Sequence, residues 1–233
     1  MTVSVALAAY NGEEFIEEQI NSILPQLSAE DEIVISLDPS TDGTREMICF
    51  ISKKDPRVKL FDGTGRGVIK NFENAITHCK NDIIFLCDQD DIWLDGKVER
   101  VKKEFENPET VLVMHDAKIV DKELNTIESS FFEQRKSGTG IVKNLIKNTY
   151  IGCCMAFRGS CCEYLLPIPE NIPMHDQWIG LMCERHGKIV LINEPLILYR
   201  RHGGNASSDK HSSVLNMIKW RLQMISALLK REL

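Results

Sequence analysis

At residues 83–93 the chain reads Ile83-Ile84-Phe85-Leu86-Cys87-Asp88-Gln89-Asp90-Asp91-Ile92-Trp93, so an apolar run leads directly into three carboxylates. A short continuous apolar run is typical of a strand that is covered on both faces of a parallel sheet. Carboxylates crowded at the end of such a strand repel one another unless a cation lies among them, and Mg²⁺ and Mn²⁺ prefer oxygen ligands. The segment therefore predicts a buried strand that ends in a divalent-cation site, with a solvated acidic turn as the alternative.

Four other apolar runs between residues 1 and 116 have the same character and alternate with segments of helical period. This alternation predicts βαβ units, and hence an α/β fold with a mostly parallel central sheet flanked by helices. The expected strands are Val3–Ala9, Glu32–Leu37, Val58–Phe61, Ile83–Cys87 and Val111–His115. The expected helices begin after Asn11 and Asp42 and span Val68–His78 and Gly96–Phe105.

The alternation weakens beyond Asp116. The polar residues 118–147 predict a flexible loop or lid, and the later segments predict a smaller, mixed portion. Its expected elements are an apolar run at Ile151–Phe157, a helix at His175–Arg185, strands at Lys188–Ile192 and Leu196–Tyr199, and a terminal helix from Ser213. We therefore expect one domain over residues 1–211, with halves at 1–116 and 117–211, followed by a C-terminal helix over 212–233.

The composition is that of an ordinary globular chain, since 43% of its 233 residues are hydrophobic and 27% are charged. A net charge of -6 leaves no broad cationic surface for a nucleic-acid backbone, so we expect no nucleic-acid partner. No apolar run approaches the roughly 20 residues that span a bilayer, and the first residues lack a secretory signal, which favours a cytoplasmic protein. The eight cysteines show no C-x-x-C spacing and are expected to be buried, reduced thiols.

Two further loops follow predicted strands. The first is Leu37-Asp38-Pro39-Ser40-Thr41-Asp42-Gly43-Thr44, which places Asp38 directly after a strand, although its residues also suit a simple turn. The second is Gly63-Thr64-Gly65-Arg66-Gly67, which leads through Lys70 into a helix and suits an anion such as a diphosphate. Because open α/β sheets bind ligands at the carboxyl ends of their strands, we expect Asp38 and the acidic cluster to share one rim.

In chain order these segments resemble the family-2 inverting glycosyltransferases, which have the GT-A fold with its Rossmann-like sheet. The matching segments are Val5–Gly12 (first strand and Tyr-Asn turn), Leu37–Thr44 (nucleotide loop), Asp88–Trp93 (DxD metal motif), Asn148–Phe157 (acceptor-side strand), Met174–Trp178 (base) and Tyr199–His202 (Tyr-Arg-x-His element). Together with Asp88–Trp93, the segment Gly67–Phe72 is most similar to bacterial rhamnosyltransferases of surface polysaccharide synthesis.

The resemblance implies a single displacement that moves a sugar from a nucleotide-diphosphate donor to a glycan or lipid-linked acceptor. Asp176 would take the proton of the acceptor hydroxyl as the general base. Mn²⁺ or Mg²⁺ would be held by Asp90, Asp88 and His202. The donor would contact Ala8, Tyr10, Asp38, Lys70, Asp88 and Arg200, and the residues that contact the acceptor or support the site would be Asp91, Trp93 and His175.

One departure from the family pattern lies in the nucleotide loop, where Leu37 replaces an acid that often contacts the base, so Asp38 would take over that contact. Two other functions remain as alternatives: an inactive homologue that only binds a nucleotide sugar or carbohydrate, and a sugar-phosphate nucleotidyltransferase. A nucleotidyltransferase should carry a basic, Gly-rich loop after its first strand, and this chain has the acidic Tyr10-Asn11-Gly12-Glu13-Glu14 there.

The C-terminal helix has an apolar face wider than a single-faced helix needs. Four interpretations follow: packing in the core, a homodimer, peripheral contact with the inner membrane surface, and packing against residues beyond the sequence given.

Overall fold

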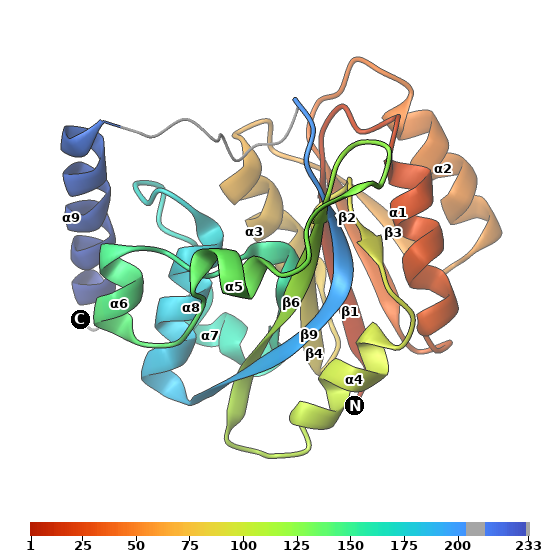
Figure 1. Ribbon diagram of the computed structural model, residues 1–233. Coiled ribbons are helices and arrows are strands. Elements are labelled where there is room, and N and C mark those ends of the chain that lie inside the picture. Colours follow the sequence, from red (N-terminus) through yellow and green to blue (C-terminus); the bar gives the residue numbers. More distant parts are fainter. Residues whose placement is uncertain (204–212, 232–233) are drawn as a thin grey trace.

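The computed structural model describes residues 1–203 and 213–231, which form a mixed sheet surrounded by helices (Figure 1). In space the strands follow the order β3-β2-β1-β4-β8-β6-β9-β5, and β7 pairs with β6. The strands are β1 Val3–Ala9, β2 Glu32–Leu37, β3 Val58–Asp62, β4 Ile83–Cys87, β5 Ile92–Trp93, β6 Thr110–Val120, β7 Thr126–Glu128, β8 Met155–Arg158 and β9 Lys188–Arg200. The α-helices are α1 Ile16–Ile23, α2 Thr44–Lys54, α3 Val68–His78, α4 Lys97–Glu104, α5 Phe131–Arg135, α6 Ile141–Ile146, α7 Cys162–Leu165, α8 His175–His186 and α9 Val214–Lys230.

The first half of the chain forms the expected parallel sheet. Strands β3, β2, β1 and β4 run parallel, and Val5 pairs with Ile33 on one side and Phe85 on the other. Every residue of β2 and β4 is buried, which explains why their sequences are apolar runs rather than alternating patterns. The five strands expected in this half are therefore confirmed, and the helix over Val68–His78 is found with the expected bounds.

The first helix begins at Ile16, later than the position directly after Asn11 that the sequence predicts. Asn11 has a positive φ of 45°, and its side-chain oxygen accepts a hydrogen bond from the Thr41 N–H at 2.9 Å. The predicted N-cap is therefore wrong, because this contact between loops uses the side chain that would have capped the helix.

The second half interrupts the parallel order. Strand β8 lies antiparallel between β4 and β6, and β6 pairs parallel with β9. Strand β6 continues to Val120 across the boundary expected between residues 116 and 117, so both halves share one sheet. The two strands expected at Lys188–Ile192 and Leu196–Tyr199 are one continuous strand, β9. Residues 212, 232 and 233 of the expected C-terminal helix lie outside the described residues.

Residues 118–147 are not the flexible loop that their polarity predicts. They contain the end of β6, β7, α5 and α6, and the paired Phe131 and Phe132 are buried in the core. The Asp116 carboxylate fixes the start of α5, because it accepts hydrogen bonds from the Ser130 hydroxyl and, at 2.8 Å, from the Phe132 N–H. The prediction failed because two adjacent aromatic residues give no periodic pattern but anchor the whole segment.

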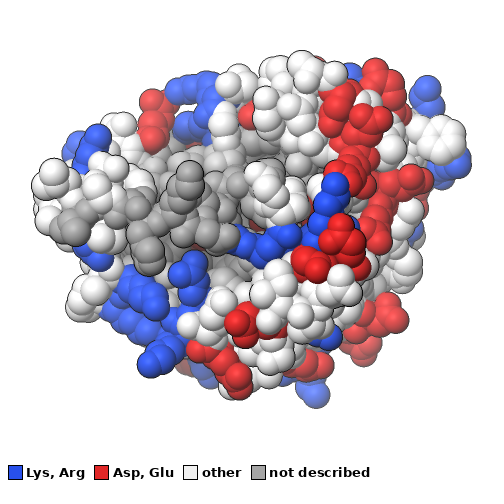
Figure 2. Space-filling model, turned by 45° about the horizontal axis from the view of Figure 1, so that its top comes forward, with Lys and Arg blue, Asp and Glu red and all other residues white. Residues whose placement is uncertain are grey.

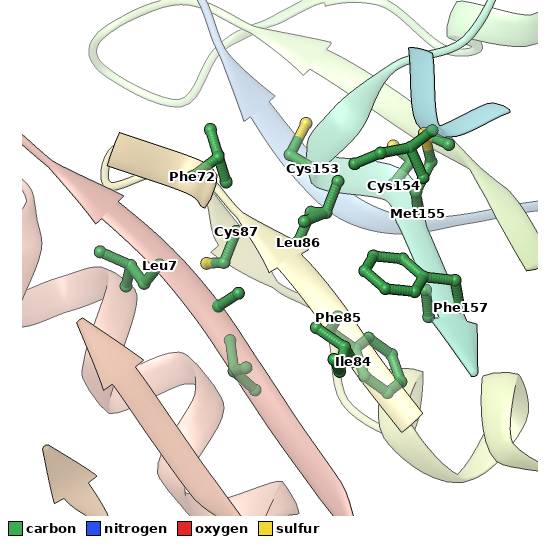
Figure 3. Packing of buried hydrophobic residues seen from close by; sticks show 14 of the residues in the cluster. Leu7, Phe72, Ile84, Phe85, Leu86, Cys87, Cys153, Cys154, Met155 and Phe157 are labelled. Atoms are coloured by element: carbon green, nitrogen blue, oxygen red, sulfur yellow. The ribbon is translucent and has the colours of Figure 1, made fainter. Parts of the chain in front are cut away.

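The core surrounds the strand that carries the acidic cluster. Figure 3 shows Phe85 and Leu86 of β4 between Leu7 of β1 and Phe157 of β8, and all four side chains are at most 1% exposed. The eight cysteines are free thiols, as predicted; five of them are buried, and Cys49, Cys79 and Cys162 are half-buried. Because close-packed interiors resist displacement, this packing fixes the position of the residues that follow β4.

Candidate active site

The rim of the candidate site is formed by the ends of β1, β2 and β4. Ala9 pairs with Leu37, and Leu7 pairs with Cys87, so the residues after these three strands emerge at one edge of the sheet. Ala8, half-buried and paired with Ser36, lies one residue inside this edge. The site residues predicted after β1, β2 and β4 are therefore neighbours in the fold, as the parallel register requires.

Gln89 joins the loop after β4 to the loop after β1. Its side-chain oxygen accepts from the Tyr10 N–H at 2.8 Å, and its side-chain amide donates to the Tyr10 carbonyl at 2.9 Å. A Cβ at Gly12 would collide with the Gln89 carboxamide, so glycine is required there. This pair of bonds fixes the Tyr10 backbone and leaves the Tyr10 ring exposed at the rim.

Asp38 is buried at the end of β2 and orders the Gly-rich loop. Its N–H donates to the Ala9 carbonyl at 2.9 Å, and its carboxylate accepts from the Gly65 N–H at 2.8 Å. A Cβ at Gly63 would collide with the same carboxylate. Asn71 on α3 completes the arrangement by donating to the Ala9 carbonyl at 3.0 Å.

Lys70 lies on the same helix but is engaged elsewhere. Its ammonium group donates to the Glu73 carboxylate at 2.8 Å and to the Ile168 carbonyl at 3.0 Å. These contacts join α3 to the segment after α7, which gives Lys70 a structural role that the sequence does not indicate.

The acidic cluster contains Asp88 and Asp91 together with the thiol of Cys153. One ligand atom from each of the three lies within 4.8 Å of the other two. Asp91 is 1% exposed, and its Oδ1 accepts a hydrogen bond from the Arg200 N–H at 3.0 Å. Its other carboxylate oxygen, Oδ2, is buried and has no hydrogen-bond partner among the described residues. A buried carboxylate oxygen without a partner is costly, and a cation would satisfy it.

The electrostatics of the cluster agree with a cation site. Withdrawal from water raises the pKa of Asp88 to about 7, and the charges of Asp90 and Asp176 add to the rise. The pKa of Asp91 is also raised well above its usual value, by burial first and then by Asp90 and Asp88. The neighbouring Cys153 thiol opposes both shifts. Oxygen donors with raised pKa values beside one thiol fit a divalent cation such as Mn²⁺ or Mg²⁺.

Asp90 points to a different neighbour. Its Oδ2 lies 2.8 Å from His202 Nε2, and the His202 ring packs on Phe15 with ring centroids 4.7 Å apart. The structure therefore places Asp90 beside His202, two of the three residues expected to hold the cation, on the side where the chain leaves β9.

Arg200 is buried at the end of β9 and holds this strand to α1. Its guanidinium forms an ion pair with Glu18 at 2.5 Å and donates to the Lys122 carbonyl at 3.3 Å. It also lies over the Phe15 ring, 5.0 Å from the centroid. The backbone N–H of Arg200 also holds Asp91, and a contact of the Arg200 side chain with the donor stays a prediction.

Asp176 lies in the first turn of α8, buried beside the acidic cluster. Burial raises its pKa to about 6, although the Gln177 N–H and the Asn148 amide, at 3.3 Å, donate to its carboxylate and oppose the rise. A carboxylate with this pKa is ionised at neutral pH and is a stronger base than an exposed one. Its neighbour His175 faces the core, stacked on Phe72 at 4.1 Å between ring centroids, and burial lowers the pKa of His175 to about 3.

Trp93 and Lys97 lie beneath the acidic cluster. Trp93 is 3% exposed and packs against Phe85, which favours the supporting role over the acceptor contact that the sequence also allows. Lys97 is fully buried; its ammonium donates to the Cys153 carbonyl at 3.1 Å and lies 3.8 Å from the centre of the Trp93 ring. No sequence pattern indicates that Lys97 is buried, because a lysine at the start of a polar helix normally faces solvent.

The comparison with protein families agrees with this geometry. The model of the family described as "Glycosyl transferase family 2" matches residues 4–166, which include β1, the Asp38 loop and the acidic cluster.

Three curated relatives have between 27% and 29% identity to the chain. An uncharacterized glycosyltransferase of Nostoc is 27% identical over 88% of this chain and 66% of its own length. The Escherichia coli UDP-Glc:alpha-D-GlcNAc-diphosphoundecaprenol beta-1,3-glucosyltransferase WfgD is 28% identical over 89% of this chain and 80% of its own. The Shigella flexneri dTDP-rhamnosyl transferase RfbG is 29% identical over 85% of this chain and 72% of its own.

Two solved structures share the fold. Staphylococcus aureus TarS in complex with UDP-GlcNAc superposes with a TM-score of 0.78 at 17% identity, over all of this chain and 68% of that chain. The mannosyltransferase PcManGT of Pyrobaculum calidifontis, in complex with GDP-Man and Mn²⁺, gives a TM-score of 0.64 at 18% identity, over 98% of this chain and 62% of that chain. The chain therefore belongs to glycosyl transferase family 2 and has the GT-A fold.

Proposed function

We propose that the protein transfers a sugar from a nucleotide-diphosphate donor to a hydroxyl of a glycan or lipid-linked acceptor in surface polysaccharide synthesis. The observation that carries the proposal is the buried Asp176, whose raised pKa suits a base, beside a cluster of carboxylates that fits a divalent cation. The activities in the names of WfgD and RfbG agree with a sugar transferred from a UDP or dTDP donor.

The donor would lie across the rim. Its nucleoside would lie near Tyr10 and Asp38, where the Gly63–Gly67 loop is held to the Asp38 carboxylate. The diphosphate would then reach the acidic cluster at the end of β4. The complexes of TarS with UDP-GlcNAc and of PcManGT with GDP-Man support this class of ligand for the fold.

Asp88, Asp91 and Asp90 would hold the Mn²⁺ or Mg²⁺. The unpartnered Asp91 Oδ2 and the raised pKa of Asp88 are the features of this chain that a cation would relieve. When bound, such an ion neutralises the charge that develops on the leaving diphosphate.

The Asp176 carboxylate would accept the proton of the acceptor hydroxyl. As it does so, the acceptor oxygen forms a bond to the anomeric carbon, and the bond from that carbon to the diphosphate oxygen breaks with inversion. The Asn148 amide orients the carboxylate, and the buried His175 and Phe72 pack beneath the first turn of α8. A single general base contributes roughly 10² to 10⁴ in rate.

The test measures nucleoside diphosphate release from UDP-, dTDP-, GDP- and CDP-sugars with Mn²⁺, in the presence of a polyprenyl diphosphate-linked sugar as acceptor. The wild type should use one nucleotide class, and Asp176→Asn should bind the same donor while kcat falls by about 10² to 10⁴. Asp95→Asn, which changes an exposed carboxylate close to the motif, is the matched control and should retain activity.

Full activity in Asp176→Asn would refute its role as the base. Donor binding by the wild type without any release would instead support the inactive, sugar-binding homologue.

A further inference from the structure

Helix α9 presents an apolar face to solvent. Five exposed aliphatic side chains recur along it at intervals of three and four residues. They are Leu215, Ile218, Leu222, Ile225 and Leu229, with exposed fractions between 38% and 78%. Such spacing places all five on one side of a helix. The core does not cover this face, so the core-packing interpretation accounts only for the opposite side of α9.

The opposite side fixes α9 to the body of the protein. Met224 and Leu228 are buried there, and the Arg221 guanidinium donates to the Ile146 carbonyl at 2.6 and 3.1 Å. Arg231 donates to the Leu166 carbonyl at 2.9 Å. The helix is therefore docked in one orientation, with its apolar face held outward.

Helix α6 extends the same surface. Val142 and Ile146 are 71% and 61% exposed, and the bonds from Arg221 to Ile146 join α6 to α9, which lie side by side (Figure 1). We call residues 141–147 and 214–231 the α6–α9 surface. Two segments about seventy residues apart in the chain thus contribute to one exposed apolar area, which in a monomer usually marks an interaction site.

The α6–α9 surface is basic, although the whole chain has a net charge of -6. Its two segments contain no Asp or Glu, and their basic residues are Lys143, Lys147, Lys219, Arg221, Lys230 and Arg231. Figure 2 shows Lys and Arg gathered at the lower left, on the side of α6 and α9, and Asp and Glu concentrated at the right. Glu170 lies across a groove of about 750 Å³ beside α9. Its carboxylate forms an ion pair with the Arg66 guanidinium at 2.5 Å.

This charge pattern disfavours a second copy of the helix as the occupant. The spacing of the apolar side chains would suit a coiled coil, but Lys219 and Arg221 flank it and α9 offers no acid to pair with them. An insertion across the bilayer is also disfavoured, because none of the described helices is long and apolar enough to span a membrane.

We propose that the α6–α9 surface binds an anionic phospholipid bilayer peripherally, with α9 lying in the plane of the interface. Helices with a leucine- and isoleucine-rich face flanked by Lys and Arg lie in the interface between headgroups and acyl chains. Anionic lipids attract their basic side chains. The binding does not depend on catalysis, so it can be tested separately from the proposed function.

The test is co-flotation of the full chain with vesicles of phosphatidylcholine alone or mixed with phosphatidylglycerol. The wild type should bind the anionic vesicles at least about tenfold more tightly, and added salt should weaken the binding because it screens surface charges. The double variant Leu222→Asp, Ile225→Asp should lose at least about tenfold in affinity, because charged groups are costly to bury. Ile127→Asp on β7, where Ile127 is 54% exposed, is the matched control and should bind like the wild type.

Two outcomes would overturn the proposal. One is a wild type that binds neither type of vesicle, or that binds vesicles with and without phosphatidylglycerol equally tightly. The other is a wild type that sediments as a dimer which Leu222→Asp, Ile225→Asp converts to a monomer, because the apolar face would then belong to a second copy. Circular dichroism and donor binding by the variants show that they fold, since both substituted side chains are exposed.

Discussion

Replacing Asp176 by Asn should stabilise the fold at neutral pH although it removes the proposed base. Burial raises the pKa of Asp176 from 3.8 to about 6, so ionising this carboxyl costs more free energy in the folded protein than in the unfolded chain. At about 1.36 kcal/mol per pKa unit, the cost is roughly 3 kcal/mol. Asparagine keeps a side-chain oxygen that can accept from Asn148 but carries no charge.

The sign follows from proton linkage. Between pH 3.8 and about 6 the folded state holds the Asp176 proton more tightly than the unfolded state, so rising pH lowers the wild type's free energy of unfolding. The difference between variant and wild type should therefore be near zero below this window and reach its full value above it. At neutral pH the variant should melt roughly 6–12 °C higher, at about 2–4 °C per kcal/mol for a domain of this size.

Urea unfolding at several pH values from 4 to 8 measures this difference, since carboxylates that do not interact with Asp176 contribute equally to the two proteins. Loss of the Asp176 charge should also lower the raised pKa of Asp88, which adds to the stability of the variant at neutral pH. Asp95→Asn, at an exposed site, should change the free energy of unfolding by less than about 0.5 kcal/mol at every pH. The reasoning is refuted if Asp176→Asn is no more stable than the wild type at pH 8, or if its advantage does not change with pH.

Two further predictions concern the neighbours of the catalytic carboxylates. Asn148→Ala removes a hydrogen bond that lowers the pKa of Asp176. The pKa should therefore rise, and the acidic limb of the plot of kcat against pH should move to higher pH. An acidic limb that does not move would contradict the assignment of Asp176 as the base. Cys153→Ala removes a thiol whose sulfur lies within 4.8 Å of ligand oxygens of Asp88 and Asp91, so the Mn²⁺ concentration for half-maximal activity should rise by roughly tenfold or more. Cys154→Ala, which changes the next buried cysteine, is the control and should leave this Mn²⁺ concentration nearly unchanged. Equal effects in the two variants would show that the change comes from lost packing alone.

Much of the parallel half and its rim could be predicted, because apolar runs define strand ends and parallel register brings those ends together. Asp38 and Asp88 are adjacent to the rim for that reason. The antiparallel insertion of β8 could not be predicted, since a four-residue strand carries no sign of its direction.

The partners of charged residues were also beyond prediction. Arg200 and Lys70 have the charge that a diphosphate needs, but Glu18 pairs with one and Glu73 with the other. The buried position of Lys97 depends on how α4 packs against β6 and β9 and on the position of the Cys153 carbonyl, and local sequence does not encode that packing.

The central claim is that the rim formed by Asp38 and the acidic cluster binds a nucleotide diphosphate together with a divalent cation. A thermal-shift panel of UDP, dTDP, GDP and CDP, each with Mn²⁺ or with EDTA, tests it most directly on the wild type and on Asp88→Asn. One nucleotide should stabilise the wild type only with Mn²⁺, by about 2.7 kcal/mol at 100 times its Kd, and should not stabilise Asp88→Asn. Stabilisation that is equal in EDTA, or that none of the four nucleotides produces, would contradict the claim.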